Sequence, residues 1–89
     1  MIPLLVTYDL LPPVQDYDKI LDVIKKYDFA MLCKSSYVVN VESFQLFWKE
    51  ITSAIDESTQ IYVFTLNQSL CFESGASEEV KEWLNDHLG

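Results

Sequence analysis

Two apolar stripes at helical spacing, each lying between short apolar strands, most constrain the fold of this chain. In both stripes the apolar residues recur every three or four positions, which indicates helices buried along one side. The stripes consist of Tyr17, Ile20, Leu21, Ile24 and Tyr27, and of Phe44, Phe47, Trp48, Ile51 and Ile55. The apolar runs at 2–8, 29–33, 37–41 and 61–66 predict strands. Lys34-Ser35-Ser36 predicts a tight turn between the second and third strands.

The resulting order, β-α-β-β-α-β, predicts a ferredoxin-like α+β fold with a four-stranded antiparallel sheet. Two right-handed crossovers then place both helices on one face, and the strands lie in the spatial order 4-1-3-2. A short extra strand at Leu70-Cys71-Phe72 and a C-terminal helix capped by Ser77 are expected to follow. We therefore predict a single domain over 1–89, with its core at 2–66 and a β-α extension at 67–89.

The predicted strands are apolar on both faces, although two helices can cover only one face. In the first strand Leu4, Val6 and Tyr8 alternate with Leu5, Thr7 and Asp9, and in the fourth Tyr62 and Phe64 alternate with Ile61 and Val63. A soluble monomer rarely exposes an apolar face of that size. We expect a homodimer in which a second copy covers this face. The alternative is a monomer on which the chain's own tail, at 70–88, folds over it.

The charge of the chain argues against nucleic-acid binding. Fourteen acidic residues stand against six lysines, and no arginine is present, so the net charge is −8 and the pI is near 4.3. Affinity for a phosphate backbone comes largely from basic side chains, and arginine is the usual bidentate phosphate ligand. Binding to nucleic acid would therefore need a local basic patch or a bridging metal. A basic protein partner suits this charge better.

The two cysteines and the N-terminal stretch bear on the cellular compartment. Cys33 and Cys71 match no zinc-binding spacing, so we expect two partly buried, reduced thiols, with a disulfide as the alternative. MIPLLV has no basic n-region, and Asp9 interrupts the apolar stretch that follows it. These features favour neither a signal peptide nor a membrane span. We expect a cytoplasmic protein with no membrane association.

Four short segments together resemble a known family. They are Tyr8-Asp9 at the end of a strand, Asp16-Tyr17 at the start of a helix, and the strands Ser36-Tyr37-Val38-Val39 and Ile61-Tyr62-Val63-Phe64. Over roughly residues 4–66 the chain resembles the small CRISPR-associated adaptation protein, the second in that numbered series, and its SinR-like and VapD-like relatives. The resemblance implies a ferredoxin-like homodimer.

The resemblance also implies site residues. In the nuclease members of the family, the aspartate at the end of the first strand faces its symmetry mate and can hold a divalent metal. By position this aspartate is Asp9, with Tyr8 beside it, and Ser36 begins the motif of the third strand. The family's loop after the first strand usually carries basic residues, whereas the loop at 10–15, LLPPVQ, has none. This departure disfavours binding and cleavage of nucleic acid.

The candidate site is an acidic rim around Asp9. The end of the first strand, the 34–36 turn and the start of the fourth strand should meet at one edge of the sheet. Asp9, Asp16, Asp56 and Glu57 then share a rim that could hold Mg²⁺ or Mn²⁺ and activate water for phosphodiester cleavage. The alternative is a solvated rim in which Asp9 accepts hydrogen bonds from the following turn.

The other candidate residues have similarly plain alternatives. Tyr8, Tyr37 and Ser36 are candidate substrate-binding residues; otherwise the tyrosines are sheet residues with solvated hydroxyls and Ser36 is a turn residue. Trp48 is predicted in the core. His87 is predicted to interact with the end of the last helix.

Two functions follow from these observations. The first is a non-catalytic, acidic, homodimeric scaffold that binds another protein. The second is a metal-dependent endonuclease with Asp9 from each subunit at the dimer interface, which would use Mg²⁺ or Mn²⁺. The charge and the unbasic loop favour the first function, and no cofactor is required for it.

Overall fold

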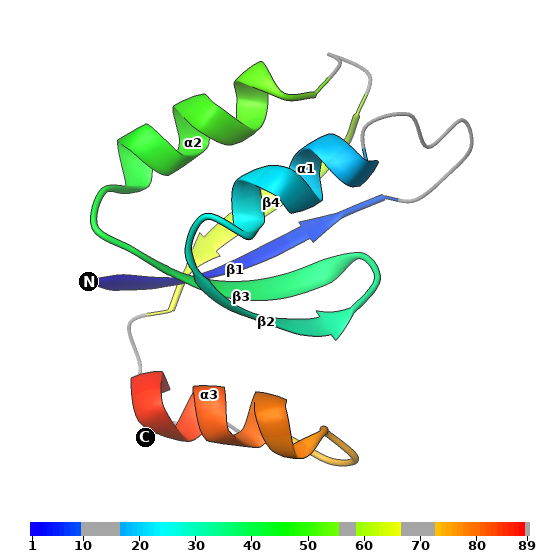
Figure 1. Cartoon of the computed structure of the whole chain (residues 1–89), viewed down its shortest axis with the longest axis vertical. Coiled ribbons are helices and arrows are strands. Elements are labelled where there is room, and N and C mark those ends of the chain that lie inside the picture. Colours follow the sequence, from blue (N-terminus) through cyan, green and yellow to red (C-terminus); the bar gives the residue numbers. More distant parts are fainter. Residues whose placement is uncertain (10–16, 56–58, 67–72, 89) are drawn as a thin grey trace.

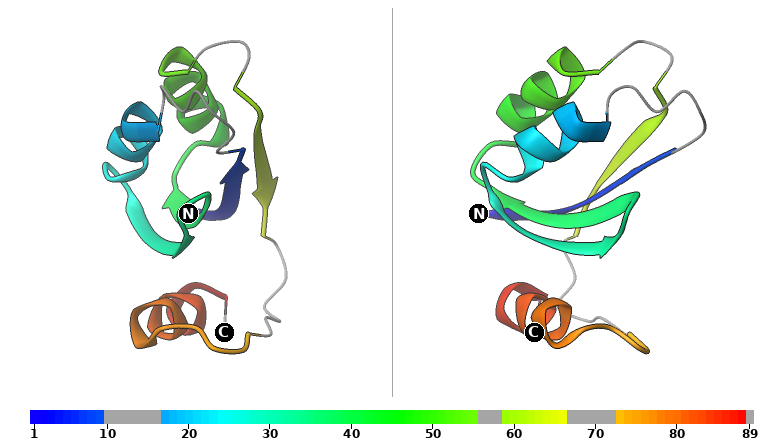
Figure 2. Two further views of the ribbon diagram at one scale, coloured as in Figure 1. Left: turned by 90° about the vertical axis from the view of Figure 1, so that its right-hand side faces the viewer. Right: turned by 45° about the vertical axis from the view of Figure 1, so that its right-hand side comes forward.

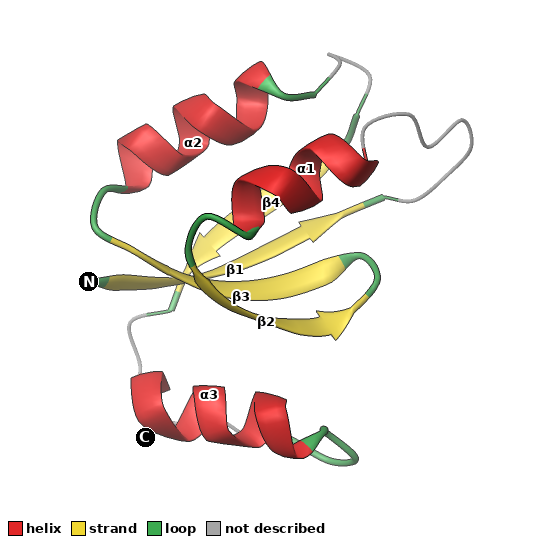
Figure 3. Cartoon of the chain, viewed as in Figure 1, coloured by secondary structure: helices red, strands yellow, loops and turns green. Residues whose placement is uncertain are grey.

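The structure of the protein is a computed structural model that describes residues 1–9, 17–55, 59–66 and 73–88. Its elements follow the predicted order along the chain (Figures 1 and 3). They are the strands β1 (Ile2–Tyr8), β2 (Asp28–Cys33), β3 (Ser36–Val41) and β4 (Ile61–Thr65), and the helices α1 (Tyr17–Ile24), α2 (Phe44–Ser53) and α3 (Glu78–Leu88). The predicted extra strand at 70–72 lies outside the described residues.

The four strands form one antiparallel sheet in the order β2-β3-β1-β4. This order is the predicted one, so the α+β, ferredoxin-like arrangement is confirmed. β1 lies between β3 and β4, with Val6 opposite Tyr37 on one side and opposite Val63 on the other. α1 and α2 lie together on one face of the sheet (Figures 1 and 2).

The main core lies between that face and the two helices. Leu4, Val6 and Tyr8 of β1 point toward the helices, because alternate residues of a strand share a face. They pack with other buried side chains of the sheet and the helices, namely Ile20, Val23, Ile24, Tyr37, Val39, Val41, Phe47 and Ile51. The burial of these apolar side chains is the main force that stabilises the fold.

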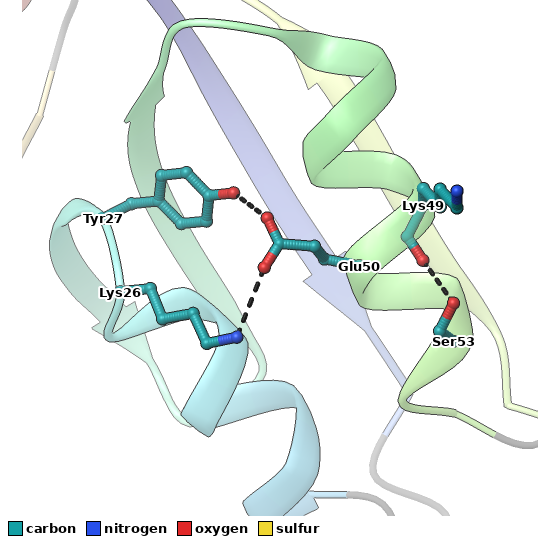
Figure 4. A network of polar contacts seen from close by, with 5 residues as sticks. All are labelled: Lys26, Tyr27, Lys49, Glu50 and Ser53. Carbon is teal, nitrogen blue, oxygen red and sulfur yellow. Dashed lines mark hydrogen bonds and ion pairs between the residues drawn. The ribbon is translucent and has the colours of Figure 1, made fainter.

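A polar bridge on the surface joins the end of α1 to α2 (Figure 4). The Tyr27 hydroxyl donates to the Glu50 carboxylate, and the Lys26 ammonium lies 3.3 Å from its other oxygen. The hydrogen bond from Tyr27, assisted by Lys26, lowers the pKa of Glu50. Burial, with Glu50 as its neighbour, raises the pKa of Tyr27 to about 12. The bridge therefore links the segment after α1 to α2 across the surface of the helix layer.

The second face of the sheet is covered in part by α3 (Figure 2). Val80 and Trp83 of the helix pack against Ala30 of β2 and Val38 of β3, and Leu5 of β1 lies at the margin. Ser77 caps the helix as predicted, because its hydroxyl oxygen accepts a hydrogen bond from the Val80 amide at 3.3 Å. α3, in the tail of the chain, therefore covers the second face over β2 and β3. Cover by the tail was the alternative to a dimer that the sequence left open. β4 lies at the far edge of the sheet, beyond α3.

Four side chains differ from their predicted environments. Trp48 is not in the core; it is 39% exposed and stacks on Phe44 with a centroid distance of 6.3 Å. Tyr8 and Tyr37 are both buried and their hydroxyls bond to protein groups, so the solvated hydroxyls predicted for them are wrong. Cys33 is exposed rather than partly buried, and Cys71 lies outside the described residues.

Candidate functional site

The end of β1, the β2–β3 turn and the start of β4 meet at one edge of the sheet, as the topology predicted. The Tyr8 amide donates to the Ser35 carbonyl at 2.9 Å, and the Asp9 amide donates to the Gln60 carbonyl at 3.0 Å. These two bonds place Asp9, which is exposed, at the open end of the central strand. Asp16, Asp56 and Glu57 lie outside the described residues, so Asp9 is the one member of the predicted acidic rim that the described residues include.

Tyr8 and Tyr37 lie together on the helix side of the sheet. Their rings stack with centroids 6.2 Å apart and an interplanar angle of 8°. The Tyr8 hydroxyl donates to the Lys34 carbonyl at 3.0 Å, and the Tyr37 hydroxyl lies 3.2 Å from that of Tyr17. Tyr8 and Tyr37 therefore form, with the partly buried Tyr17, a cluster beneath the rim in which each hydroxyl has a protein partner.

Ser36 belongs to the opposite face. It pairs with Thr7 across β1 and β3, and the two hydroxyl oxygens lie 3.0 Å apart. The candidate residues are thus neighbours along β1 and β3, but their side chains lie on different faces of the sheet. Tyr8 and Tyr37 face the helices, whereas Ser36 faces the other side. Asp9 lies at the end of β1. A ligand bound at Asp9 would have access to Ser36 more readily than to the buried tyrosines.

Burial changes the acid-base chemistry of the tyrosine cluster. Desolvation raises the pKa of Tyr8 to about 12, and the hydrogen bond from Tyr37 opposes this only in part. Desolvation is the largest cause that raises the pKa of Tyr37 well above its ordinary value, and the hydrogen bonds to Tyr17 and Tyr8 raise it further. Both hydroxyls are therefore protonated at neutral pH and act as hydrogen-bond donors, which makes them unsuitable as general bases.

These shifts predict a late alkaline titration of the folded protein. A tyrosine whose pKa is higher in the folded than in the unfolded protein contributes to the free energy of unfolding. This contribution is fully present below about pH 10, the ordinary pKa of tyrosine. It is lost as the pH rises through about 12, the pKa of Tyr8 in the folded protein. We expect the tyrosinate absorbance of Tyr8, Tyr27 and Tyr37 to appear late and together with unfolding. Absorbance at 295 nm and circular dichroism would be recorded from pH 9 to 13, with the urea-unfolded protein as control. Coincident titration curves for folded and unfolded protein would contradict this expectation.

The rim gives limited support for a metal site. Within residues 1–9, 17–55, 59–66 and 73–88, no group of three or more His, Cys, Asp or Glu side chains is placed to hold a metal ion. Cys33 lies in the β2–β3 turn region, where hydrogen bonds from Ser35 and Ser36 lower the pKa of its thiol. Among the described residues Asp9 therefore belongs to no such group, and a metal shared with a second copy of the chain stays a prediction.

Sequence reasoning missed the polar anchor that holds α3 to the sheet. The Trp83 indole nitrogen donates to one oxygen of Asp28 at 3.1 Å, and His87 Nε2 lies 2.7 Å from the other oxygen. His87 Nδ1 lies 2.8 Å from the Trp83 carbonyl, and the two rings stack with centroids 4.0 Å apart. The predicted contact of His87 with the end of its helix is therefore present. The link to Asp28 could not be predicted, because 59 residues separate it from His87.

Comparison with known proteins identifies no family for this chain. No protein-family model matches the sequence, and no curated protein does so significantly. The resemblance to the CRISPR-associated adaptation proteins therefore stays a prediction. In the part of the chain that the structure describes, no helix has the length and apolar character needed to cross a membrane.

Proposed function

We propose that the protein is an acidic, homodimeric scaffold module that binds a protein partner without strong affinity for nucleic acid. The observation that carries the proposal is an aromatic strip on β4, formed by Tyr62 and Phe64. Each of these side chains is 54% exposed. In a chain with a net charge of −8, such a strip is a strong candidate for a contact surface.

The position of the aromatic strip supports this reading. Thr7 and Leu5 of β1 are opposite Tyr62 and Phe64, so the strip continues the second face of the sheet beyond α3. Aromatic side chains are enriched where proteins meet, because they bury a large area and lose few rotamers. The strip is therefore the part of the second face that remains for a second copy of the chain.

The charge of α3 suits a basic partner on the same side of the molecule. Its solvent side carries four exposed carboxylates, from Glu78, Glu79, Glu82 and Asp86. Lys81 offsets them only in part, through a surface contact of 3.6 Å with Glu78. Such a surface attracts basic proteins over distances of about 10 Å at moderate ionic strength and repels phosphate backbones.

A divalent-metal endonuclease is the second candidate function. The exposed position of Asp9 at the end of the central strand favours it, because a carboxylate there can be shared with another subunit. This function requires Mg²⁺ or Mn²⁺ and a dimer in which two Asp9 side chains approach each other.

Cleavage assays separate the two functions. Purified protein would be incubated with single- and double-stranded DNA and RNA, with Mg²⁺ or Mn²⁺, from pH 6 to 9. We expect no cleavage and no difference between the protein and its Asp9→Asn variant. Metal-dependent cleavage that the Asp9→Asn substitution abolishes would overturn the scaffold proposal and establish the nuclease.

A further inference from the structure

The outer edge of β4 is an unusual surface for this chain. β4 is an edge strand in the order β2-β3-β1-β4, and no described strand pairs with its outer side. Its five residues, IYVFT, carry no charge and have high β-propensity. Natural proteins usually protect such an edge with charge, proline or a covering segment, because an open edge invites another strand to pair with it.

The hydrogen bonds to β1 show which backbone groups face outward. The Asp9 amide donates to the Gln60 carbonyl, and the Leu66 amide donates to the Pro3 carbonyl at 2.8 Å. Antiparallel strands alternate between residues that bond to a given neighbour and residues that face away from it. Residues 60, 62, 64 and 66 therefore bond to β1, whereas Ile61, Val63 and Thr65 present their amides and carbonyls to the open edge.

We propose that β4 pairs in antiparallel fashion with β4 of a second copy, with Val63 opposite Val63 of the partner subunit. This inference rests on the proposed homodimer and specifies how it forms. In this register Ile61 lies opposite Thr65 of the partner subunit, and the reverse pair is equivalent by symmetry. All the outward groups of the three residues are then satisfied, and the two sheets become one continuous sheet across a two-fold axis.

The same register also accounts for the aromatic strip. Tyr62 lies opposite Phe64 of the partner subunit, and Phe64 lies opposite Tyr62 of the partner subunit, all on the second face. Both are non-hydrogen-bonded pairs, in which side chains approach most closely. Aromatic side chains that lie opposite each other on neighbouring strands stabilise the pairing of those strands. The two pairs bring together side chains that are each 54% exposed in a single copy.

The uncharged side chains of Ile61–Thr65 favour another uncharged strand, such as β4 of a second copy, over a charged foreign strand. Two molecules with a net charge of −8 repel each other over most of their surfaces, but Ile61–Thr65 has no charge to oppose the approach. The aromatic and apolar side chains of one β4 complement those of the other under the two-fold axis. Salt should therefore strengthen the pairing, because it screens the repulsion between the two copies.

This arrangement has a consequence for Asp9. Asp9 lies level with Gln60 on β1, and its symmetry mate lies level with Leu66. With strands about 4.8 Å apart and a rise of about 3.3 Å per residue, the two Asp9 positions lie roughly 25 Å apart. A metal ion bridging both carboxylates needs them within a few ångström. The β4 dimer therefore excludes a metal site shared by the two Asp9 residues.

Amide hydrogen exchange tests the pairing directly. Exchange would be followed by NMR over a hundredfold range of protein concentration, with sedimentation equilibrium to measure the dimer fraction. We expect protection of the Ile61, Val63 and Thr65 amides to rise with the dimer fraction. The Tyr62 and Phe64 amides, which bond to β1, should be protected at every concentration and serve as internal controls.

Each outcome of the exchange experiment bears on a different claim. A monomer at all concentrations would overturn both the homodimer and the β4 pairing. A dimer in which the three outward amides stay unprotected would overturn the pairing and leave the homodimer in place. Protection that does not depend on concentration would also overturn the pairing, because it would mean that the chain covers its own edge.

A pair of double variants tests the register. Tyr62→Lys with Phe64→Lys places like charges opposite each other across the axis, and we expect dimerisation to weaken by about tenfold or more. Tyr62→Lys with Phe64→Glu places opposite charges at the same two positions, and we expect it to dimerise more tightly than the first variant. Equal dimerisation of the two variants would overturn the register. Circular dichroism checks that both remain folded.

Discussion

Replacing Phe47 by alanine is expected to lower the free energy of unfolding by about 3–5 kcal/mol. Phe47 is fully buried between α2 and the sheet, and its ring contacts that of Tyr27 edge to face with a centroid distance of 5.3 Å. The substitution removes a large apolar surface and leaves a cavity that a sheet and two helices can fill only in part. Since domains of this size have about 5–15 kcal/mol in total, the variant should be close to unfolding at room temperature.

The neighbouring residue offers a matched control. Leu46 precedes Phe47 on the same helix and is 57% exposed. Leu46→Ala removes an apolar side chain of similar kind at similar helical propensity, so we expect a change within about 0.5 kcal/mol. Urea unfolding followed by far-ultraviolet circular dichroism measures both. Comparable losses for the two variants would contradict the position of Phe47 at the centre of the core.

The sheet order followed from sequence because periodicity and chain connection together leave few alternatives. Two helical stripes that alternate with strands require crossovers, and right-handed crossovers place β1 between β3 and β4. Trp48 shows where this reasoning fails. Its spacing from Phe44 and Ile51 fits the buried stripe, but Phe47 and Ile51 fill the space against the sheet. Trp48 then lies at the flank of α2, stacked on Phe44.

The candidate site was predictable only as a location. The meeting of β1, the β2–β3 turn and the start of β4 follows from topology, and the structure places Asp9 there. The separation of Ser36 from Tyr37 by the sheet follows from the period of a strand. The stacking of Tyr37 on Tyr8 depends on the register of β1 and β3, in which Val6 lies opposite Tyr37. No pattern in this sequence specifies that register.

The cover of the second face was left open for a similar reason. The sequence shows an apolar stripe on α3, but it does not show which strands that stripe contacts. The position over β2 and β3 combines apolar packing on Ala30 and Val38 with a hydrogen bond from Trp83 to Asp28, an exposed residue at the start of β2. With α3 over β2 and β3, the side chains of Tyr62 and Phe64 on β4 are left exposed.

Trp83→Ala is expected to release α3 from the second face of the sheet, because Trp83 supplies both its packing and its hydrogen bond to the sheet. Trp83 is 6% exposed, packs on Ala30 and Val38, and anchors Asp28 and His87. A truncation of this kind costs about 3–5 kcal/mol. We expect the cost to fall on docking of α3 rather than on the main core, because the helix contacts a separate cluster.

The released segment should also lose its helical structure. An isolated helix shorter than about 12–15 residues is marginal in water, and α3 has 11 residues. Limited proteolysis and amide exchange would therefore show opening of 78–88 while the amides of β1 and β3 remain protected. Trp48→Ala is the matched control, since it removes an exposed tryptophan from α2 and should leave α3 protected.

A third variant separates packing from the polar anchor. Trp83→Phe keeps most of the apolar contact but removes the donor to Asp28, so we expect a smaller loss, of about 1–3 kcal/mol. Because Trp83→Ala uncovers Ala30 and Val38 beside the aromatic strip, that variant should also associate more strongly than the wild-type protein. Protected α3 amides in Trp83→Ala, or cooperative loss of the whole fold, would contradict a helix that docks as a separate unit on the second face.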